Sequence, residues 1–221
     1  MAKQVALIHT SAMMVAPFKA LAEELLAGVS VFHMVDESLL RDIIRDGRLG
    51  AATARRVVGH VLAAADAGAD AVMVTCSSVG AAVELSRSLV IVPVLRVDEP
   101  MARRAVATGL RIGVVATLPS TLAPTADLIR RLAAEAGKKV QVTDRLCEGA
   151  FAAVLAGDTA THDAKVAAAL GELGKQSDVI VLAQASMARV ADALPVEQRR
   201  VPILSSPRLA VEKLAEVLKS L

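Results

Sequence analysis

The chain has very few aromatic residues and no long run of one kind of charge. Its 221 residues include no Trp, no Tyr and 3 Phe, and its net charge is +2, from 25 basic and 23 acidic side chains. The basic residues come as scattered pairs, a distribution typical of solvated helix faces. Because nucleic-acid-binding surfaces combine clustered positive charge with stacking rings, we expect no nucleic-acid partner.

Long apolar runs and clustered cysteines are also missing. No stretch approaches the roughly 18 uncharged apolar residues that a membrane-spanning helix needs, so we expect no membrane partner. The short apolar run within the first 14 residues is interpreted as a strand and not as part of a signal peptide. The 2 Cys, Cys76 and Cys147, are too far apart in sequence to suggest a disulfide framework or a metal-ligand pair. We therefore predict a cytoplasmic protein that binds no metal.

Short β-branched runs alternate with longer helical patterns along the chain. Strands are predicted at residues 5–9, 71–75, 91–95, 112–117, 139–143, 179–183 and 201–204. Two of the intervening helical patterns end at Gly28 and Gly68, and glycine is the residue that best suits a helix C-terminus. This alternation predicts an α/β fold built from βαβ units, with parallel strands covered on both faces.

The second half of the chain repeats the first. Residues 69–83 align with residues 177–191 at a constant offset of 108. The matched pairs are Asp70 with Asp178, Cys76 with Gln184, Ser78 with Ser186 and, at the same offset, His9 with Thr117. Slipped by one position, residues 92–95 match residues 201–204. We therefore predict two pseudo-symmetric lobes, 1–97 and 98–205, each a small parallel sheet flanked by helices.

Small polar residues follow the predicted strands. Because ligands of open α/β sheets bind beyond the carboxyl ends of the strands, two facing lobes are expected to share one interlobe active-site cleft. The hydroxyl, thiol and amide groups at these ends belong to Thr10, Ser11, Cys76, Ser77, Ser78, Thr117, Ser120, Thr121, Gln184, Ser186, Ser205 and Ser206. Together they suit a carboxylate. For any single hydroxyl, helix capping is the simpler interpretation.

Cys76 follows a predicted buried strand and precedes a predicted helix. The positive field of a helix N-terminus is expected to lower the pKa of its thiol, which would suit acid/base or nucleophilic chemistry. The alternative is a small buried apolar side chain. Cys147 has no counterpart in the repeat, so a structural role is favoured. Glu148 either reaches the cleft or stabilises a helix N-terminus.

Four segments of the chain carry a family resemblance. They are DAVMVTCSSVG (70–80), RIGVVATLPST (111–121), DVIVLAQASM (178–187) and VPILSSPRLAVEKL (201–214). In this order they resemble the aspartate/glutamate racemase superfamily, which includes hydantoin racemase, maleate isomerase and arylmalonate decarboxylase. The resemblance implies a two-lobed fold without a cofactor, a homo-oligomer, and a C-terminal helix at 206–221 that completes lobe 1. It also implies one cysteine from each lobe beside the substrate's α-carbon.

Gln184 stands where this family has its second cysteine. An amide neither gains nor loses a proton near neutral pH, so two-thiol racemisation is not expected. We predict a cofactor-independent isomerase or lyase acting on a small carboxylic acid, with Cys76 as its single catalytic thiol. The expected binding residues are His9, Ser11, Ser77, Ser78, Thr117, Ser120, Thr121, Gln184 and Ser186. The alternative is a non-catalytic small-carboxylate-binding protein derived from a racemase.

Several further residues have open roles at this stage. Racemisation would need a second base, for which His9 is the best candidate, although a histidine at a strand end is more often only hydrogen-bonded. Arg96 is a candidate clamp for a second carboxylate. Four residues after the first helical pattern are candidates for the mouth of the cleft: Phe32, His33, Asp36 and Glu37. The alternative for Asp36 is to cap the helix that begins near Glu37.

Overall fold

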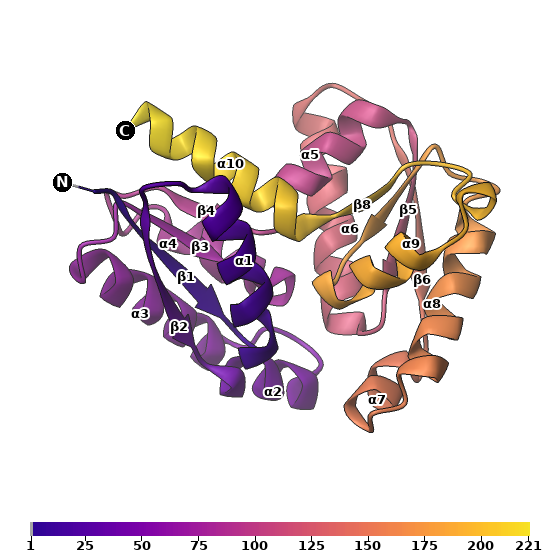
Figure 1. The fold of residues 1–221 in the computed structure, drawn as a ribbon, viewed down its shortest axis with the longest axis horizontal. Coiled ribbons are helices and arrows are strands. Elements are labelled where there is room, and N and C mark those ends of the chain that lie inside the picture. The colour runs from indigo at the N-terminus through magenta and orange to yellow at the C-terminus, as the bar shows by residue number, and fades with distance from the viewer. Residues whose placement is uncertain (1) are drawn as a thin grey trace. The chain divides into compact units, whose positions relative to one another are not determined.

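The computed structural model describes residues 2–221, which form two α/β units (Figure 1). Unit 1 extends to Pro100 and also contains Pro207–Leu221, and unit 2 comprises Met101–Ser206. The lobe boundaries predicted from the sequence lie one to three residues earlier. Each unit is a four-stranded parallel sheet covered by helices.

Unit 1 has the strand order β2-β1-β3-β4. Its strands are β1 (Gln4–His9), β2 (Ser30–Val35), β3 (Ala71–Val74) and β4 (Val94–Arg96). Its helices are η1 (Ala12–Met14), α1 (Val15–Leu25), α2 (Glu37–Asp46), α3 (Ala51–Asp66), η2 (Ser77–Val79), α4 (Gly80–Ser86) and most of α10 (Ser206–Ser220), where η marks a 3₁₀-helix. Because every strand pairs in parallel, all the carboxyl ends lie at one edge of the sheet.

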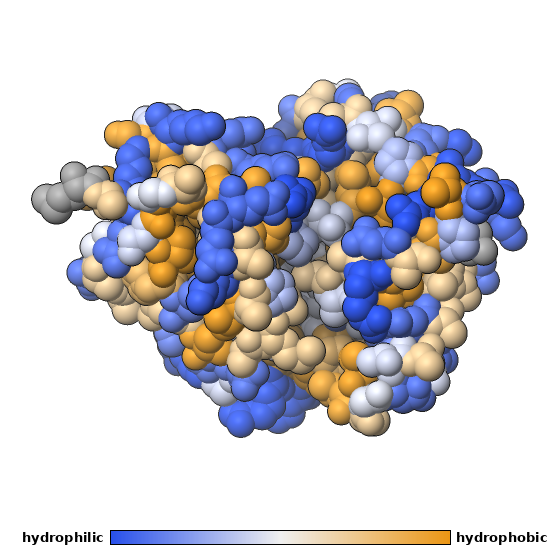
Figure 2. Space-filling view, viewed as in Figure 1, coloured by the Kyte–Doolittle hydropathy of each residue, from blue (hydrophilic) through white to orange (hydrophobic). Residues whose placement is uncertain are grey.

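The two faces of this sheet are covered by different helices. Side chains alternate along β1, so Val5 and Leu7 pack with α1 and α10, while Ala6 and Ile8 pack with α2, α3 and α4. α10 turns Val211, Leu214 and Leu218 onto the sheet, and Figure 2 shows hydrophilic residues on its outer side. The last helix of the chain therefore belongs to the core of unit 1.

Unit 2 has the same topology, with the strand order β6-β5-β7-β8. Its strands are β5 (Arg111–Ala116), β6 (Gln141–Leu146), β7 (Val179–Leu182) and β8 (Ile203–Ser205). Its helices are α5 (Glu99–Thr108), which begins at the unit boundary, α6 (Pro119–Glu135), α7 (Ala150–Leu155), α8 (Thr159–Leu173), η3 (Ala185–Met187), α9 (Ala188–Ala193) and η4 (Val196–Gln198). The predicted α/β fold of two similar parallel units is confirmed.

Edge strands are the elements that sequence analysis located least well. β2 is absent from the predicted strands, and β6 begins and ends later than the predicted strand at 139–143. Both lie at the outer edge of a sheet and are partly exposed along their length. These two edge strands therefore lack the continuous apolar run by which β3 and β7, buried throughout, are recognised.

The aspartates matched by the repeat are structural. Asp70 accepts a hydrogen bond from the backbone N–H of Gln4 at 2.6 Å, and Asp178 accepts one from the N–H of Arg111 at 2.8 Å. Each carboxylate thus ties the chain before one strand to the amino end of its neighbour. The Arg111 side chain and the Arg111 and Leu110 N–H groups also hold the pKa of Asp178 down to about 2. Both aspartates lie at the amino ends of the strands, opposite the carboxyl ends where the site is predicted.

A buried ion cluster closes the β4 side of unit 1. The Arg96 guanidinium donates to both oxygens of Asp98, at 3.0 and 2.8 Å, and to Glu84 at 2.5 Å. Arg96 and Asp98 are both buried. The guanidinium lies against Gly80, where an added Cβ would stand 2.2 Å from it. Arg96 is therefore occupied by two carboxylates of its own unit instead of presenting a free clamp to a ligand.

Replacing Gly80 by alanine should destabilise unit 1. The new methyl group would displace the Arg96 guanidinium and leave buried charges poorly paired, at an expected cost of about 2–4 kcal/mol in the free energy of unfolding. Gly59→Ala is the matched control, because Gly59 also lies in a helix and an added Cβ there meets nothing within 4 Å. That control should be neutral or slightly stabilising. Urea unfolding compares the two variants, and equal stability would contradict the role given to Gly80.

Candidate active site

The strand registers of the two units define which residues are equivalent. In unit 1, Val5 of β1 pairs with Ala71 of β3; in unit 2, Ile112 of β5 pairs with Val179 of β7. The offset of 108 is thus confirmed for the third strands, and Cys76 and Gln184 are equivalent. For the first strands the register requires an offset one residue smaller. The predicted match of His9 with Thr117 is therefore wrong, because Thr117 corresponds to Thr10.

Cys76 lies two residues beyond β3, at the residue that precedes η2. It is partly exposed and packs against the apolar cluster on the α3 and α4 side of the sheet. Its sulfur has hydrogen-bonding partners in the Thr10 side chain, the Ser78 side chain and N–H, and the Val79 N–H. These groups form a cradle of donors around the thiol, built from the turns that follow β1 and β3.

The expected lowering of the Cys76 pKa is wrong. Burial raises the pKa of this thiol, and the hydrogen bonds from Thr10, Ser78 and Val79 offset that effect only in part. The sequence argument considered the dipole of the following helix but could not see how far the sulfur is removed from water. At neutral pH the protonated thiol is therefore the dominant form.

Gln184 occupies the equivalent position in unit 2 and is held by the equivalent threonine. Its Oε1 accepts a hydrogen bond from the backbone N–H of Thr117 at 2.6 Å and from the Thr117 hydroxyl at 2.9 Å. A backbone N–H can only donate, so these contacts identify which end of the amide is oxygen. The two contacts orient the amide of Gln184, and its NH₂ group takes part in neither of them.

The two units therefore repeat one local arrangement with different chemistry. A threonine after the first strand bonds to the residue two positions beyond the third strand, which is a thiol in unit 1 and an amide in unit 2. Sequence analysis placed Thr10 at a strand end but not among the binding residues. The offset of 107 that pairs it with Thr117 was the signal that could have identified it.

His9 is enclosed at the end of β1. Its ring is 0 % exposed, its Nδ1 lies 2.8 Å from the Thr75 hydroxyl, and its Nε2 lies 2.9 Å from Nδ1 of His33. Burial and the nearby His33 lower the pKa of His9 to about 4. His9 is therefore neutral at pH 7 and has both ring nitrogens engaged. Direct substrate binding by His9, or a role as a second base, stays a prediction that requires these contacts to break.

The predicted hydroxyls of unit 1 gather near the carboxyl end of its sheet. Ser77 and Ser78 are buried in η2, directly after Cys76, and Ser78 contacts the sulfur. Ser11 precedes η1 and its side chain makes no capping hydrogen bond, so the capping interpretation fails for this residue. The three serines lie on the turns that follow β1 and β3.

Unit 2 presents its own set at the corresponding edge. Ser120 and Thr121 lie in the first turn of α6, and Ser186 lies in η3 after Gln184. Thr121 is buried, and the Ser120 hydroxyl is enclosed with no hydrogen-bond partner. The Ser120 hydroxyl is thus a buried donor that none of the described residues uses. That these residues and those of unit 1 bind one substrate stays a prediction.

Asp36 and Cys147, whose roles the sequence left undecided, have structural roles. Asp36 caps α2 by accepting from the Ser38 N–H, and its pKa is lowered to about 2 because the hydrogen bonds from Ser38, His60 and Arg56 outweigh partial desolvation. Cys147 is 5 % exposed and packs in the core of unit 2, while its neighbour Glu148 is exposed.

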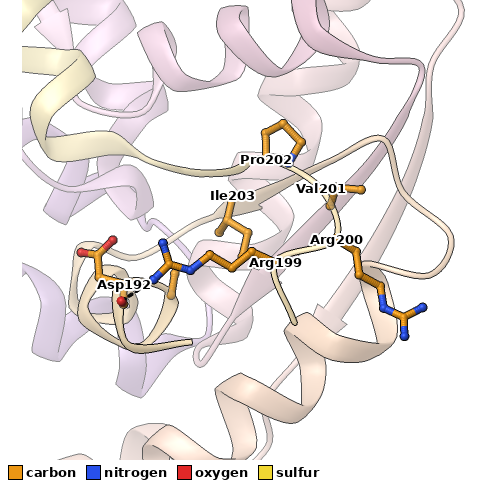
Figure 3. A pocket seen from close by; sticks show the side chains of 7 residues that line it. Asp192, Arg199, Arg200, Val201, Pro202 and Ile203 are labelled. Atoms are coloured by element: carbon orange, nitrogen blue, oxygen red, sulfur yellow. Dashed lines mark hydrogen bonds between the residues drawn. The ribbon is translucent and has the colours of Figure 1, made fainter. Parts of the chain in front are cut away.

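A separate cavity lies apart from the predicted site residues. Within residues 2–221, no group of three or more His, Cys, Asp or Glu side chains could hold a metal ion, and no helix is both long and apolar enough to cross a bilayer. The separate cavity, of about 350 Å³, lies beside the start of β8 (Figure 3). Near it, Arg199 donates to the carbonyl oxygens of Asp192 and Leu194. None of the predicted site residues lines this cavity.

The protein is thus an α/β protein of two similar parallel units, with a thiol surrounded by hydrogen-bond donors at a strand end of the first. Residues 6–214 match the model of the Asp/Glu/Hydantoin racemase family, and the chain belongs to this family. The resemblance expected from the four sequence segments is thereby confirmed. Family and fold support an isomerase-type enzyme.

Solved structures of racemases share this fold at low sequence identity. A glutamate racemase isoform from Bacillus anthracis has a TM-score of 0.72 and 19% identity, covering 99% of this chain and 82% of its own. An allantoin racemase from Klebsiella pneumoniae has a TM-score of 0.67 and 22% identity, covering 99% and 88%. A search of curated protein sequences found no match.

The buried His9 ring should make stability depend on pH. The unfolded chain protonates this residue near pH 6.5, whereas the folded pKa is about 4. Between these values the unfolded state binds the extra proton, so the free energy of unfolding should fall as pH drops through this window, by on the order of 3 kcal/mol.

Urea unfolding of the wild type and His9→Asn at several pH values tests this expectation. The variant should lose most of the fall between pH 6.5 and about 4. Val35→Ala, at an exposed end of the neighbouring strand, should keep the wild-type dependence. A His9→Asn variant with an unchanged pH dependence would disprove the assignment.

Proposed function

We propose that this protein is a cofactor-independent isomerase or lyase of small carboxylic acids that uses Cys76 as its only proton-transferring thiol. The observation that carries this proposal is the repeated strand-end arrangement, with Thr10 against a thiol in unit 1 and Thr117 against an amide in unit 2. The family resemblance implies that two thiols work from such positions. With Gln184 in the second position, proton transfer falls to one side only.

The raised pKa of Cys76 favours an acid over a base. In a decarboxylation, the bond between the α-carbon and one carboxylate breaks and that carboxylate leaves as CO₂. The electron pair of the bond is delocalised into the remaining carboxyl group as an enolate. The Cys76 S–H then delivers its proton to the α-carbon, and the resulting thiolate recovers a proton from water. In a 1,2-proton shift, the thiolate removes a proton from one carbon and returns it to the neighbouring carbon on the same face.

Neutral donors would stabilise the charge that develops in either reaction. The NH₂ of Gln184 and the Ser120 hydroxyl are suited to donate to an enolate or carboxylate oxygen, as oxyanion-hole donors do. Ser77, Ser78 and Ser11 are the corresponding donors of unit 1. That Gln184 acts on the same substrate molecule as Cys76 is part of the proposal.

Incubation in D₂O with chiral 2-amino, 2-hydroxy and 2-substituted dicarboxylic acids tests this function. Proton NMR should show deuterium entering the α-position with one configuration, or a decarboxylated product, because a single thiol serves one face. Cys76→Ala should lower the rate by about 10³-fold or more, as expected for loss of an acid/base group. Cys147→Ala, which removes the structural thiol, should keep the rate within a few-fold of wild type.

The outcome also separates the proposal from its alternative, a non-catalytic small-carboxylate-binding protein. Turnover that survives in Cys76→Ala would refute the role of the thiol. If no compound of the panel reacts, but one of them raises the melting temperature of the wild type and of Cys76→Ala equally, the protein is a binder.

Gln184→Cys should add a second proton carrier. Once an active compound is known, the variant is expected to exchange the α-proton with loss of configuration, because the family resemblance implies that thiols at these two positions flank the α-carbon. Chiral chromatography measures the enantiomer ratio, and Gln184→Ser is the control that introduces a small polar group without a thiol's acidity. Retention of configuration in Gln184→Cys would show that Gln184 does not face the substrate.

A further inference from the structure

A chain of hydrogen bonds crosses three strands of unit 1 next to Cys76. Starting on β2, His33 Nδ1 meets His9 Nε2 on β1 at 2.9 Å, and His9 Nδ1 meets the hydroxyl of Thr75, the residue after β3, at 2.8 Å. The two imidazoles are nearly parallel, at 22°, with ring centroids 5.1 Å apart. Thr75 also lies 3.2 Å from the carbonyl oxygen of Ile8.

All hydrogen bonds of this chain can form with both imidazoles neutral. If the Thr75 hydroxyl donates to Ile8, it accepts from His9 Nδ1–H, and His9 Nε2 accepts from His33 Nδ1–H. If Thr75 instead donates to His9 Nδ1, then His9 Nε2–H donates to His33. Each arrangement uses one proton per imidazole. The neutral pair therefore ties the ends of β1, β2 and β3 together on the α1 side of the sheet.

The hydrogen-bond chain lies one residue away, along the sequence, from the residues that make the thiol's own contact. His9 is followed by Thr10, which donates to Cys76, and Thr75 is followed by Cys76 itself. Successive residues of a strand point to opposite faces of the sheet. The hydrogen-bond chain therefore joins the two strand ends on one face, while Thr10 contacts Cys76 on the other. The distance between the Thr10 hydroxyl and the sulfur then depends on how the histidines hold the backbone.

Unit 2 provides an internal comparison. Its registers make Ala116 the equivalent of His9, Ala183 the equivalent of Thr75 and Asp144 the equivalent of His33. No such chain can form there, because two of the three positions carry only a methyl group. The polar chain is therefore found in the unit whose strand end carries a thiol, and not in the unit whose strand end carries an amide.

We propose that His9 and His33 are positioning residues that hold the Thr10 hydroxyl against the Cys76 thiol and thereby set its reactivity. The inference rests on the proposed function in taking Cys76 as the reactive group. His33 acts through His9, and His9 acts through the two strand ends, so neither histidine needs to touch the substrate. Breaking the chain should let the Thr10 hydroxyl move away from the sulfur, and the thiolate would lose a donor.

The test is the rate at which iodoacetamide alkylates Cys76 as a function of pH, in a Cys147→Ser background so that one thiol is measured. His33→Phe keeps a ring beside His9 but removes the hydrogen bond, and Thr75→Val removes the other end of the chain with little change of shape. Both should move the midpoint of the pH profile upward. At a fixed pH below that midpoint, both should slow alkylation by about three- to tenfold, the effect expected when one hydrogen bond of typical net strength is lost.

Two further variants separate positioning from general damage to the fold. His33→Asn carries an oxygen or nitrogen where Nδ1 of the imidazole lies and should restore the wild-type profile. His60→Gln, at another partly exposed histidine of unit 1, should leave the profile unchanged. Wild-type alkylation in both His33→Phe and Thr75→Val, or slowing in His33→Phe that His33→Asn fails to reverse, would overturn the proposal. Because alkylation needs no substrate, the D₂O experiment can fail while this one succeeds.

Discussion

Each unit depends on the parallel pairing of its first and third strands, β1 with β3 and β5 with β7. This pairing brings the turn after the first strand beside the turn after the third, and a threonine hydroxyl joins the two turns in both units. The same register, maintained twice along the chain, makes Cys76 and Gln184 equivalent. The internal repeat is therefore a repeat of a strand-end arrangement as well as of a fold, and the two copies differ in the chemical group that the threonine holds.

The central residues of the predicted site carry little net charge in either unit. In unit 1, burial keeps Cys76 protonated and His9 neutral, and Arg96 is paired with Asp98 and Glu84. In unit 2, the Gln184 amide carries no charge. A substrate held at such strand ends would be oriented by dipoles and hydroxyls instead of fixed opposite charges. This environment suits a proton donor better than a standing thiolate, because burial disfavours the anion and the nearby donors compensate only in part.

The sequence identified some residues of the candidate site and missed others. Cys76, Ser78 and Gln184 were found because an apolar strand run precedes each turn and the repeat aligns them. Thr10 was passed over because the repeat was aligned one residue off in the first strand, where the apolar runs of β1 and β5 look alike in either register. His33 lies on an edge strand whose half-exposed pattern did not resemble a strand. Its contact with His9 depends on a pairing that residue spacing alone does not specify.

The sequence by itself determined the architecture: two parallel α/β units, their duplication and their family. The α/β units follow from the period and length of apolar runs. The duplication follows from the alignment of the two halves, and the family from the four segments that resemble it. All three are read from local stretches of the chain. Only the tertiary structure decided the state of the site. The raised pKa of Cys76, the orientation of the Gln184 amide and the occupation of Arg96 by two carboxylates each depend on desolvation or on partners distant in the sequence. Such effects arise when the chain packs, because burial and hydrogen bonding depend on neighbours in space.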